Sequence, residues 1–167
     1  MTVIPDDVSK PATPNSRSGG SGESEAILLR HQANLVAKGV VVTDMATARR
    51  EYSELVNAYL GTSVPLNDKT SSAVTTPWWC GGSFVYVPPG VDVELPIQVH
   101  AATGGAPRGP FERTLIVADR GAKVHYIEGC SAPVYTSDSL QTGVVEVVVK
   151  AGARVSFTTI QTVAHCV

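Results

Sequence analysis

The thiols of Cys80, Cys130 and Cys166 are the groups in this sequence best suited to sulfur or metal chemistry. Cysteines so far apart form neither a CxxC zinc motif nor a secreted disulfide framework, so we interpret them as free thiols in a reducing compartment. Cys130 follows Glu128-Gly129 at the end of a predicted strand, where its thiolate could attack a persulfide or bind iron. The alternative is a small side chain that fills an apolar core.

A thiolate at Cys130 needs a nearby charge or hydrogen-bond donor, and Lys123 and His125 on the same predicted strand are candidates. Side chains alternate along a strand, so the spacing leaves contact with Cys130 open. His165 and Cys166 are both soft-metal ligands, but adjacent strand residues point to opposite faces. We therefore interpret the last two as part of a nonspecific tail.

The remaining polar motifs are weaker. Cys80 follows Trp78-Trp79, and this segment is expected to cover the open end of the fold. Glu112 and Arg113 are adjacent and could form a polar pair. No Ser/His/Asp or paired-carboxylate motif for general acid–base or nucleophilic catalysis occurs in the sequence.

Composition excludes several classes of protein. Lys and Arg total 13 against 15 Asp and Glu, a formal net charge of −2, so the chain has no positive field for nucleic acid or an anionic membrane surface. No apolar run approaches the roughly 20 residues of a membrane helix, and the first residues lack the pattern of a signal peptide. We expect a cytoplasmic protein.

The chain is predicted to begin with a disordered tail over 1–22 and a helical region with a linker over 23–77. Apolar spacing predicts a first helix over 23–38, then a short extended segment at Val40–Val42. Thr43 or Asp44 can cap a second helix, which Gly61 ends.

From residue 78 the sequence repeats. Gly90, Gly121 and Gly152 recur at a spacing of 31 residues, each flanked by two β-branched segments. One such unit cannot bury its own apolar face, so the period predicts a mainly β fold, a parallel β-helix of about three rungs over 78–161. Three unrelated hairpins of an antiparallel sandwich are the alternative.

The strings FERTLI and EGC-x-AP, with GGSFVYVPPGVDVELPIQ before them, resemble the SufB family of the SUF iron–sulfur cluster assembly system over about residues 23–161. The resemblance implies a scaffold and not an enzyme: a β-helix flanked by helical regions that accepts sulfur from a cysteine desulfurase or sulfur carrier. It also implies a transient iron–sulfur cluster, and partners of the SufD type and of the SufC type, the latter supplying ATPase activity.

By the same resemblance, Cys130 matches a cysteine that receives or relays sulfur and could bind iron, and Gln161 matches a polar residue of an internal sulfur path. Gln161 could instead be an exposed strand-end glutamine. The family's Arg and Asn have no counterpart at Ala102 and Gly104, and residues 162–167 form a divergent tail. A truncated SufB-like chain without independent activity is therefore an alternative, as is a carbohydrate-active or acyl-transfer β-helix.

Overall fold

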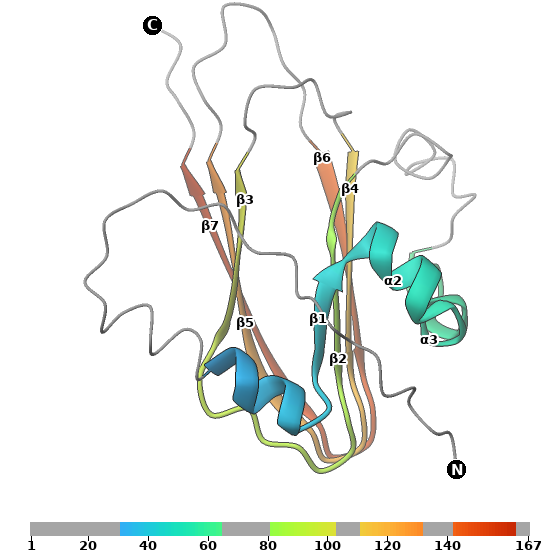
Figure 1. Cartoon of the computed structure of the whole chain (residues 1–167). Helices are drawn as coiled ribbons and strands as arrows, with labels where there is room; N and C mark the ends of the chain where they lie inside the picture. The colour runs from blue at the N-terminus through green and yellow to red at the C-terminus, as the bar shows by residue number, and fades with distance from the viewer. Residues whose placement is uncertain (1–30, 65–80, 103–110, 132–141, 163–167) are drawn as a thin grey trace, which may run out of the picture.

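The computed structural model describes residues 31–64, 81–102, 111–131 and 142–162. Its strands form two sheets that lie face to face (Figure 1). Sheet A has the order β1 (Val41–Asp44), β2 (Ser83–Val87), β4 (Phe111–Ala118), β6 (Thr142–Val149). Sheet B has the order β3 (Ile97–Ala102), β5 (Lys123–Ser131), β7 (Arg154–Thr162).

The strand register follows the 31-residue repeat. Phe84 pairs with Leu115, and Leu115 pairs with Glu146, along the parallel strands β2, β4 and β6. Tyr126 of β5 pairs with Phe157 of β7 at the same spacing. Strand β1 is the exception, since it pairs antiparallel with β2 and makes sheet A mixed.

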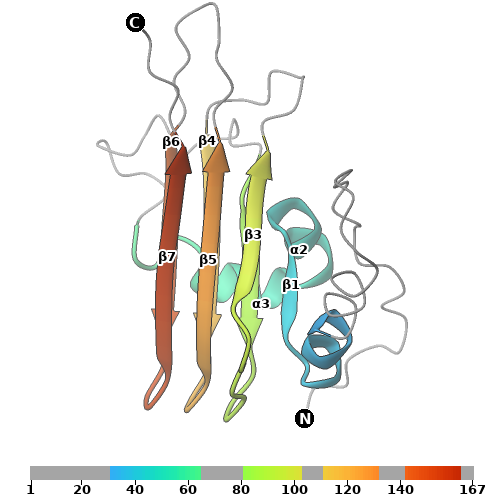
Figure 2. The ribbon, with the colours of Figure 1, turned by 90° about the vertical axis from the view of Figure 1, so that its left-hand side faces the viewer.

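The repeat is thus confirmed as a structural unit of two strands, one in each sheet. Figure 2 shows three such units side by side, each turning tightly from sheet A into sheet B. The parallel β-helix stays a prediction, because residues 103–110 and 132–141, which would close each coil, lie outside the described residues.

Glycine makes the turns possible. Gly90, Gly121 and Gly152 have φ values of 72°, 69° and 72°, in the left-handed region that a side chain disfavours. The turns stack on one another, since the Gly90 N–H donates to the Arg120 carbonyl at 2.8 Å and the Gly121 N–H to that of Ala151 at 3.0 Å. The common turn holds the repeats in register.

Side-chain alternation gives sheet A two buried faces. Val85, Val87 and Ile116 point toward sheet B and pack with Val124 and Tyr126. The alternate residues of sheet A point outward, where they pack against the helical region. These are Phe84, Leu115 and Val117, in contact with Met45, Ala48 and Val56.

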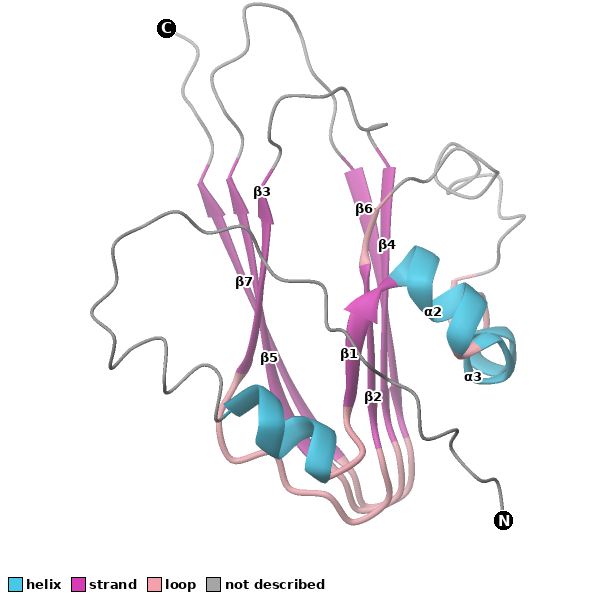
Figure 3. Ribbon diagram, viewed as in Figure 1, coloured by secondary structure: helices cyan, strands magenta, loops and turns pink. Residues whose placement is uncertain are grey.

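The helical region differs in one respect from the prediction. Residues 31–37 are helical, and Asp44 caps the next helix by accepting a hydrogen bond from the Thr47 N–H at 2.9 Å. The predicted second helix is divided into α2 (Met45–Glu51) and α3 (Ser53–Tyr59) (Figure 3). The break is at Tyr52, whose backbone leaves helical geometry while its ring stacks on Phe84 with centroids 6.2 Å apart.

Other predictions fall on segments that the structure does not describe. The predicted tail over 1–22, the start of the first helix, most of the linker and the divergent residues at the C-terminus lie outside the described residues. Among the helices that are described, none is both long and apolar enough to cross a membrane.

A buried ion pair joins the helical region to sheet A. Arg113 and Glu146 lie on neighbouring strands with both side chains fully buried, and an Arg113 Nη2 to Glu146 Oε1 distance of 2.6 Å. The Glu146 carboxylate also accepts hydrogen bonds from the backbone N–H groups of Gly61, Ser63 and Val64, just after α3. Arg113 therefore pairs with Glu146 and not with Glu112, because adjacent strand residues point to opposite faces.

Replacing Glu146 should destabilise the fold strongly. Glu146→Gln leaves the Arg113 guanidinium buried without a counter-charge, at an expected cost of about 3–5 kcal/mol. Urea denaturation measures the loss of unfolding free energy. The matched control is Asp92→Asn, which removes an exposed ion pair with Lys123 and should cost less than about 1 kcal/mol. Equal losses in the two variants would contradict this assignment.

Gly82 should tolerate no side chain. Its φ is 112°, and an added Cβ would lie 1.9 Å from the Arg113 carbonyl oxygen. Gly82→Ala should therefore reduce the unfolding free energy by about 3 kcal/mol or more, measured by thermal or urea denaturation. Gly143→Ala serves as the control, because its Cβ would meet nothing closer than the Glu112 carbonyl oxygen at 3.6 Å.

Candidate functional site

The two predicted site residues lie in register on neighbouring strands. Position 130 of β5 pairs with position 161 of β7 in the parallel sheet B, and position 101 of β3 pairs with position 130 on the other side. Figure 2 shows these three strands side by side. Two residues separated by 31 positions in the chain are thus brought together by the repeat.

Gln161 is exposed, and its backbone is the last but one position of β7. The Cys130 side chain lies outside the described residues, so only its backbone position is placed. On β3, Ala101 pairs in register with position 130, and Ala102 pairs with position 131. Gly104 lies outside the described residues.

Lys123 and His125, the two candidate neighbours of Cys130, make contacts with other residues. Lys123 Nζ donates to Asp92 at 2.8 Å, and His125 Nε2 lies 3.0 Å from the Thr158 hydroxyl. Both belong to the alternate series of β5 positions that faces away from sheet A, whereas Val124 and Tyr126 pack toward sheet A.

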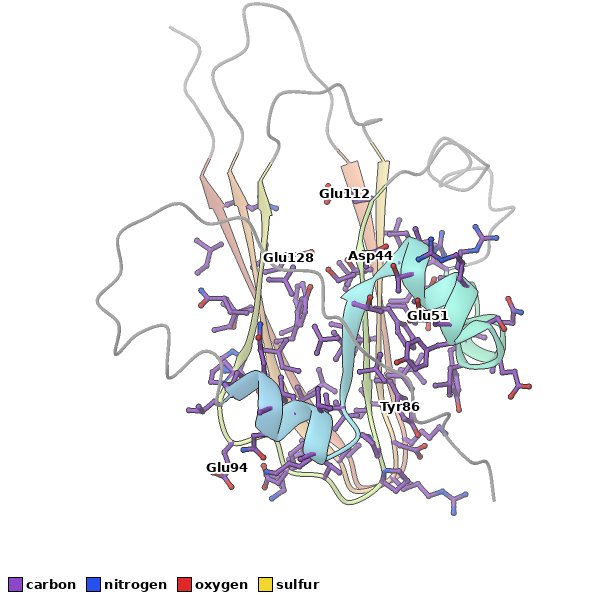
Figure 4. The ribbon with its side chains drawn as sticks, in the orientation of Figure 1. Asp44, Glu51, Tyr86, Glu94, Glu112 and Glu128 are labelled. Atoms are coloured by element: carbon purple, nitrogen blue, oxygen red, sulfur yellow. The ribbon has the colours of Figure 1, made fainter. Side chains whose placement is uncertain are left out.

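Two carboxylates occupy the space between the sheets at the same end as position 130. Glu128 lies two positions before Cys130 on β5, and Glu112 lies near the start of β4 in sheet A (Figure 4). Burial raises the pKa of Glu128, and the negative charge of Glu112 raises it further. The two carboxylates are therefore close enough to repel each other.

Neighbouring hydroxyl groups complete this arrangement. The Thr114 hydroxyl accepts a hydrogen bond from the Ser83 N–H at 3.2 Å, which leaves its proton free to donate across to the Glu128 carboxylate. Burial raises the pKa of Tyr126 to about 12, so its phenol stays protonated. A protonated phenol, a hydroxyl donor and two carboxylates make this end of the interior polar.

The sequence placed Glu112 beside Arg113 and gave Glu128 no role of its own, because linear spacing does not connect residues of facing sheets. The only available signal is alternation: each belongs to the inward-facing series of its strand. Of the other predicted residues, Cys80, His165 and Cys166 lie outside the described residues. Within the described part, no group of three or more His, Cys, Asp or Glu side chains forms a metal site.

Two protein-family models match the chain. One, described as SUF system FeS cluster assembly, SufBD core domain, matches residues 100–167. The other, described as SufBD protein N-terminal region, matches residues 26–99. Between them they cover the helical region and the repeat.

Relatives named as iron-sulfur cluster assembly SufBD family proteins are similar over most of this chain. Those of Staphylococcus aureus strain MRSA252 and of Staphylococcus saprophyticus are each 44% identical over 139 residues, and that of S. aureus strain USA300 is 43% identical. Each alignment covers 83% of this chain and 30% of the relative. The chain thus spans about 30% of the length of the curated relatives it matches.

The Glu128 carboxyl should make stability depend on pH. Its pKa is raised in the folded protein, so the cost of ionising this carboxyl begins near pH 4.5, its ordinary value, grows up to the folded-state pKa and stays constant above it. Glu128→Gln removes this cost and keeps an acceptor for Thr114. We expect the variant to gain stability relative to the natural chain between about pH 4.5 and pH 7, measured by urea denaturation.

The control for this pH dependence is Glu94→Gln, whose side chain is 80% exposed. The difference in unfolding free energy between Glu94→Gln and the natural chain should change little over the same pH range. A Glu128→Gln gain in stability that is flat or falls with rising pH would show that the pKa of Glu128 is not raised in the folded protein.

Proposed function

Because this chain belongs to the SufBD family of the SUF iron–sulfur cluster assembly system, we propose that it is a SufB-type scaffold component that accepts sulfur and iron for a nascent cluster. The proposal distinguishes SufB from SufD, whereas the matching family models describe the two together. The observation that carries it is the pairing of positions 130 and 161 in register on β5 and β7.

The proposed architecture is the first part of a parallel β-helix. Its support is the common 31-residue register of β2, β4 and β6, and of β5 with β7, together with the stacked glycine turns. In such a coil, positions 130 and 161 belong to successive rungs at one end of the interior. A group passed along the coil would then meet them one after the other.

Sulfur acceptance at Cys130 is a thiol exchange. The Cys130 thiolate attacks the outer sulfur of a persulfide on a cysteine desulfurase or sulfur carrier, and a new S–S bond forms at Cys130. The S–S bond of the donor breaks, and the donor cysteine leaves as a thiolate. The step transfers one sulfur atom without net oxidation or reduction.

Gln161 supports this step without competing for the sulfur. Its uncharged amide can donate a hydrogen bond to a persulfide at the neighbouring position 130, and it carries no thiol that would trap the sulfur. Iron would reach the same end of the sheets, where the Cys130 thiolate is the proposed ligand. The resulting cluster is cargo and is passed on.

The proposed setting is a SufBCD-type complex in the cytoplasm. A SufC-type ATPase would supply the hydrolysis of ATP, and a SufD-type sister subunit would complete the scaffold. These partners are proposed for the whole protein. The relatives are about three times as long as this chain.

One observation favours the second candidate, a SufB-like chain without independent activity. Strands β6 and β7 stand at the edges of their sheets, and they expose Val149, Phe157 and Ile160 by 49%, 39% and 53%. Apolar edge strands of this kind pair readily with another strand. On this view the chain keeps the fold of the family without its activity.

The test is anaerobic co-expression with SufC-type and SufD-type partners, followed by exposure to a desulfurase and radiolabelled cysteine. We expect labelled sulfur on the natural chain, with iron and acid-labile sulfide once an added reductant supplies the two electrons that convert persulfide sulfur to sulfide. Cys130→Ser should reduce the label to background. Cys80→Ser and Cys166→Ser are the matched controls and should keep it.

Undiminished labelling of Cys130→Ser would overturn the role given to this thiol. A chain that binds neither partner nor iron would favour the second candidate. Gln161→Leu adds a separate readout, since it should slow labelling while Cys130 remains present as the acceptor.

A further inference from the structure

The carboxylates of Glu112 and Glu128 face each other from different sheets without a counter-ion. Within the described residues neither forms a salt bridge, in contrast to the buried Glu146, which pairs with Arg113. Both side chains enter the space between the sheets (Figure 4). Two like charges placed together in a half-buried site are costly unless a proton or a cation neutralises them.

Tyr126 provides an independent sign of a missing partner. Its side chain is fully buried, and its hydroxyl makes no hydrogen bond to any described residue. Tyr126 lies two positions before Glu128 on β5, in the same series of positions that packs toward sheet A. The Ser83 side chain lies near this hydroxyl and lowers the pKa of Tyr126, but the two groups do not meet in hydrogen-bond geometry. A buried hydroxyl normally has a partner.

The surroundings hold the carboxylates in place. Gly81 pairs with Glu112 across β2 and β4, and a Cβ at Gly81 would lie 3.1 Å from Glu112 Cγ. The lack of a side chain at Gly81 thus leaves room for the Glu112 side chain. Thr114, two positions after Glu112 on β4, lies across from Glu128 and favours the ionised form of its carboxyl. Each carboxylate has its own support.

We propose that Glu112 and Glu128 bind a divalent cation between the two sheets, beside the hydroxyl of Tyr126. Two carboxylates neutralise a dication, and hard oxygen ligands of this kind suit Mn²⁺ and Fe²⁺. The Tyr126 hydroxyl would bond the ion or one of its waters and so gain its missing partner. Because Glu128 is two positions from Cys130, the ion would lie at the sulfur-accepting end of the interior.

The identity of the ion, but not the site, rests on the proposed function. A scaffold that receives iron would use Fe²⁺ here, before iron meets sulfur at Cys130. Mn²⁺ is the experimental probe, because it prefers the same oxygen ligands and does not oxidise readily in air.

Calorimetric titration of the full chain with Mn²⁺ tests the site. We expect one ion per chain, an increase in melting temperature with Mn²⁺, and competition by Fe²⁺ under anaerobic conditions. Glu112→Gln and Glu128→Gln should each weaken binding at least about tenfold. Glu94→Gln, the exposed control, should bind as the natural chain does.

The variants are also measured without metal, which separates binding from folding. Glu128→Gln relieves repulsion and should fold at least as well as the natural chain, while losing the Mn²⁺-dependent rise in melting temperature. Tyr126→Phe should weaken Mn²⁺ binding without loss of stability, because its hydroxyl has no hydrogen bond to lose among the described residues.

A natural chain that binds no Mn²⁺ or Fe²⁺, or glutamine variants that bind as tightly as the natural chain, would overturn the proposal. The same preparations are assayed for sulfur on Cys130. Labelled Cys130 without metal binding would overturn this site alone, and metal binding without labelled Cys130 would overturn the proposed function alone.

Discussion

The in-register stacking of the glycine turns is the constraint on which the rest of the structure depends. Each turn requires a residue with positive φ, and Gly90, Gly121 and Gly152 provide it. The N–H groups of Gly90 and Gly121 donate to the carbonyls of Arg120 and Ala151 in the next turn, so each repeat starts at the same height in its sheet. Shifting a strand by one residue would move its whole apolar set to the other face. The turn therefore decides which residues meet between the sheets and which meet the helices.

Sheet A is buried on both faces, and this explains the position of its ion pair. The inner face packs on sheet B, and the outer face carries α2 and α3. Arg113 and Glu146 belong to the outer series. There the Glu146 carboxylate accepts hydrogen bonds from the backbone N–H groups that follow α3. Their charges are compensated by each other and by the backbone, and they connect the helical region to the repeat.

The interior between the sheets changes character along its length. Near the turns it is apolar, with Val85, Val87 and Val124 in contact. Toward the other end it carries Glu112, Glu128 and the hydroxyl of Tyr126, and there positions 130 and 161 pair. The proposed functions share this polar end: a thiol exchange needs a thiolate and donors, and a cation needs oxygen ligands. Both follow from polar residues placed on inward-facing positions.

The repeat, its glycine turns, the Asp44 cap and the family were determined by the sequence, because local spacing carries each of them. The same spacing aligned Phe84, Leu115 and Glu146 in one column, which the register confirms. Contacts between facing sheets carry no such signal. Sequence reasoning placed Arg113 beside Glu112, where adjacent strand residues diverge, and it missed the approach of Glu112 to Glu128. The break of the helix at Tyr52, which stacks on Phe84, was also decided by tertiary packing. The physical reason is that periodicity assigns a residue to a face, whereas only the folded arrangement decides what that face meets.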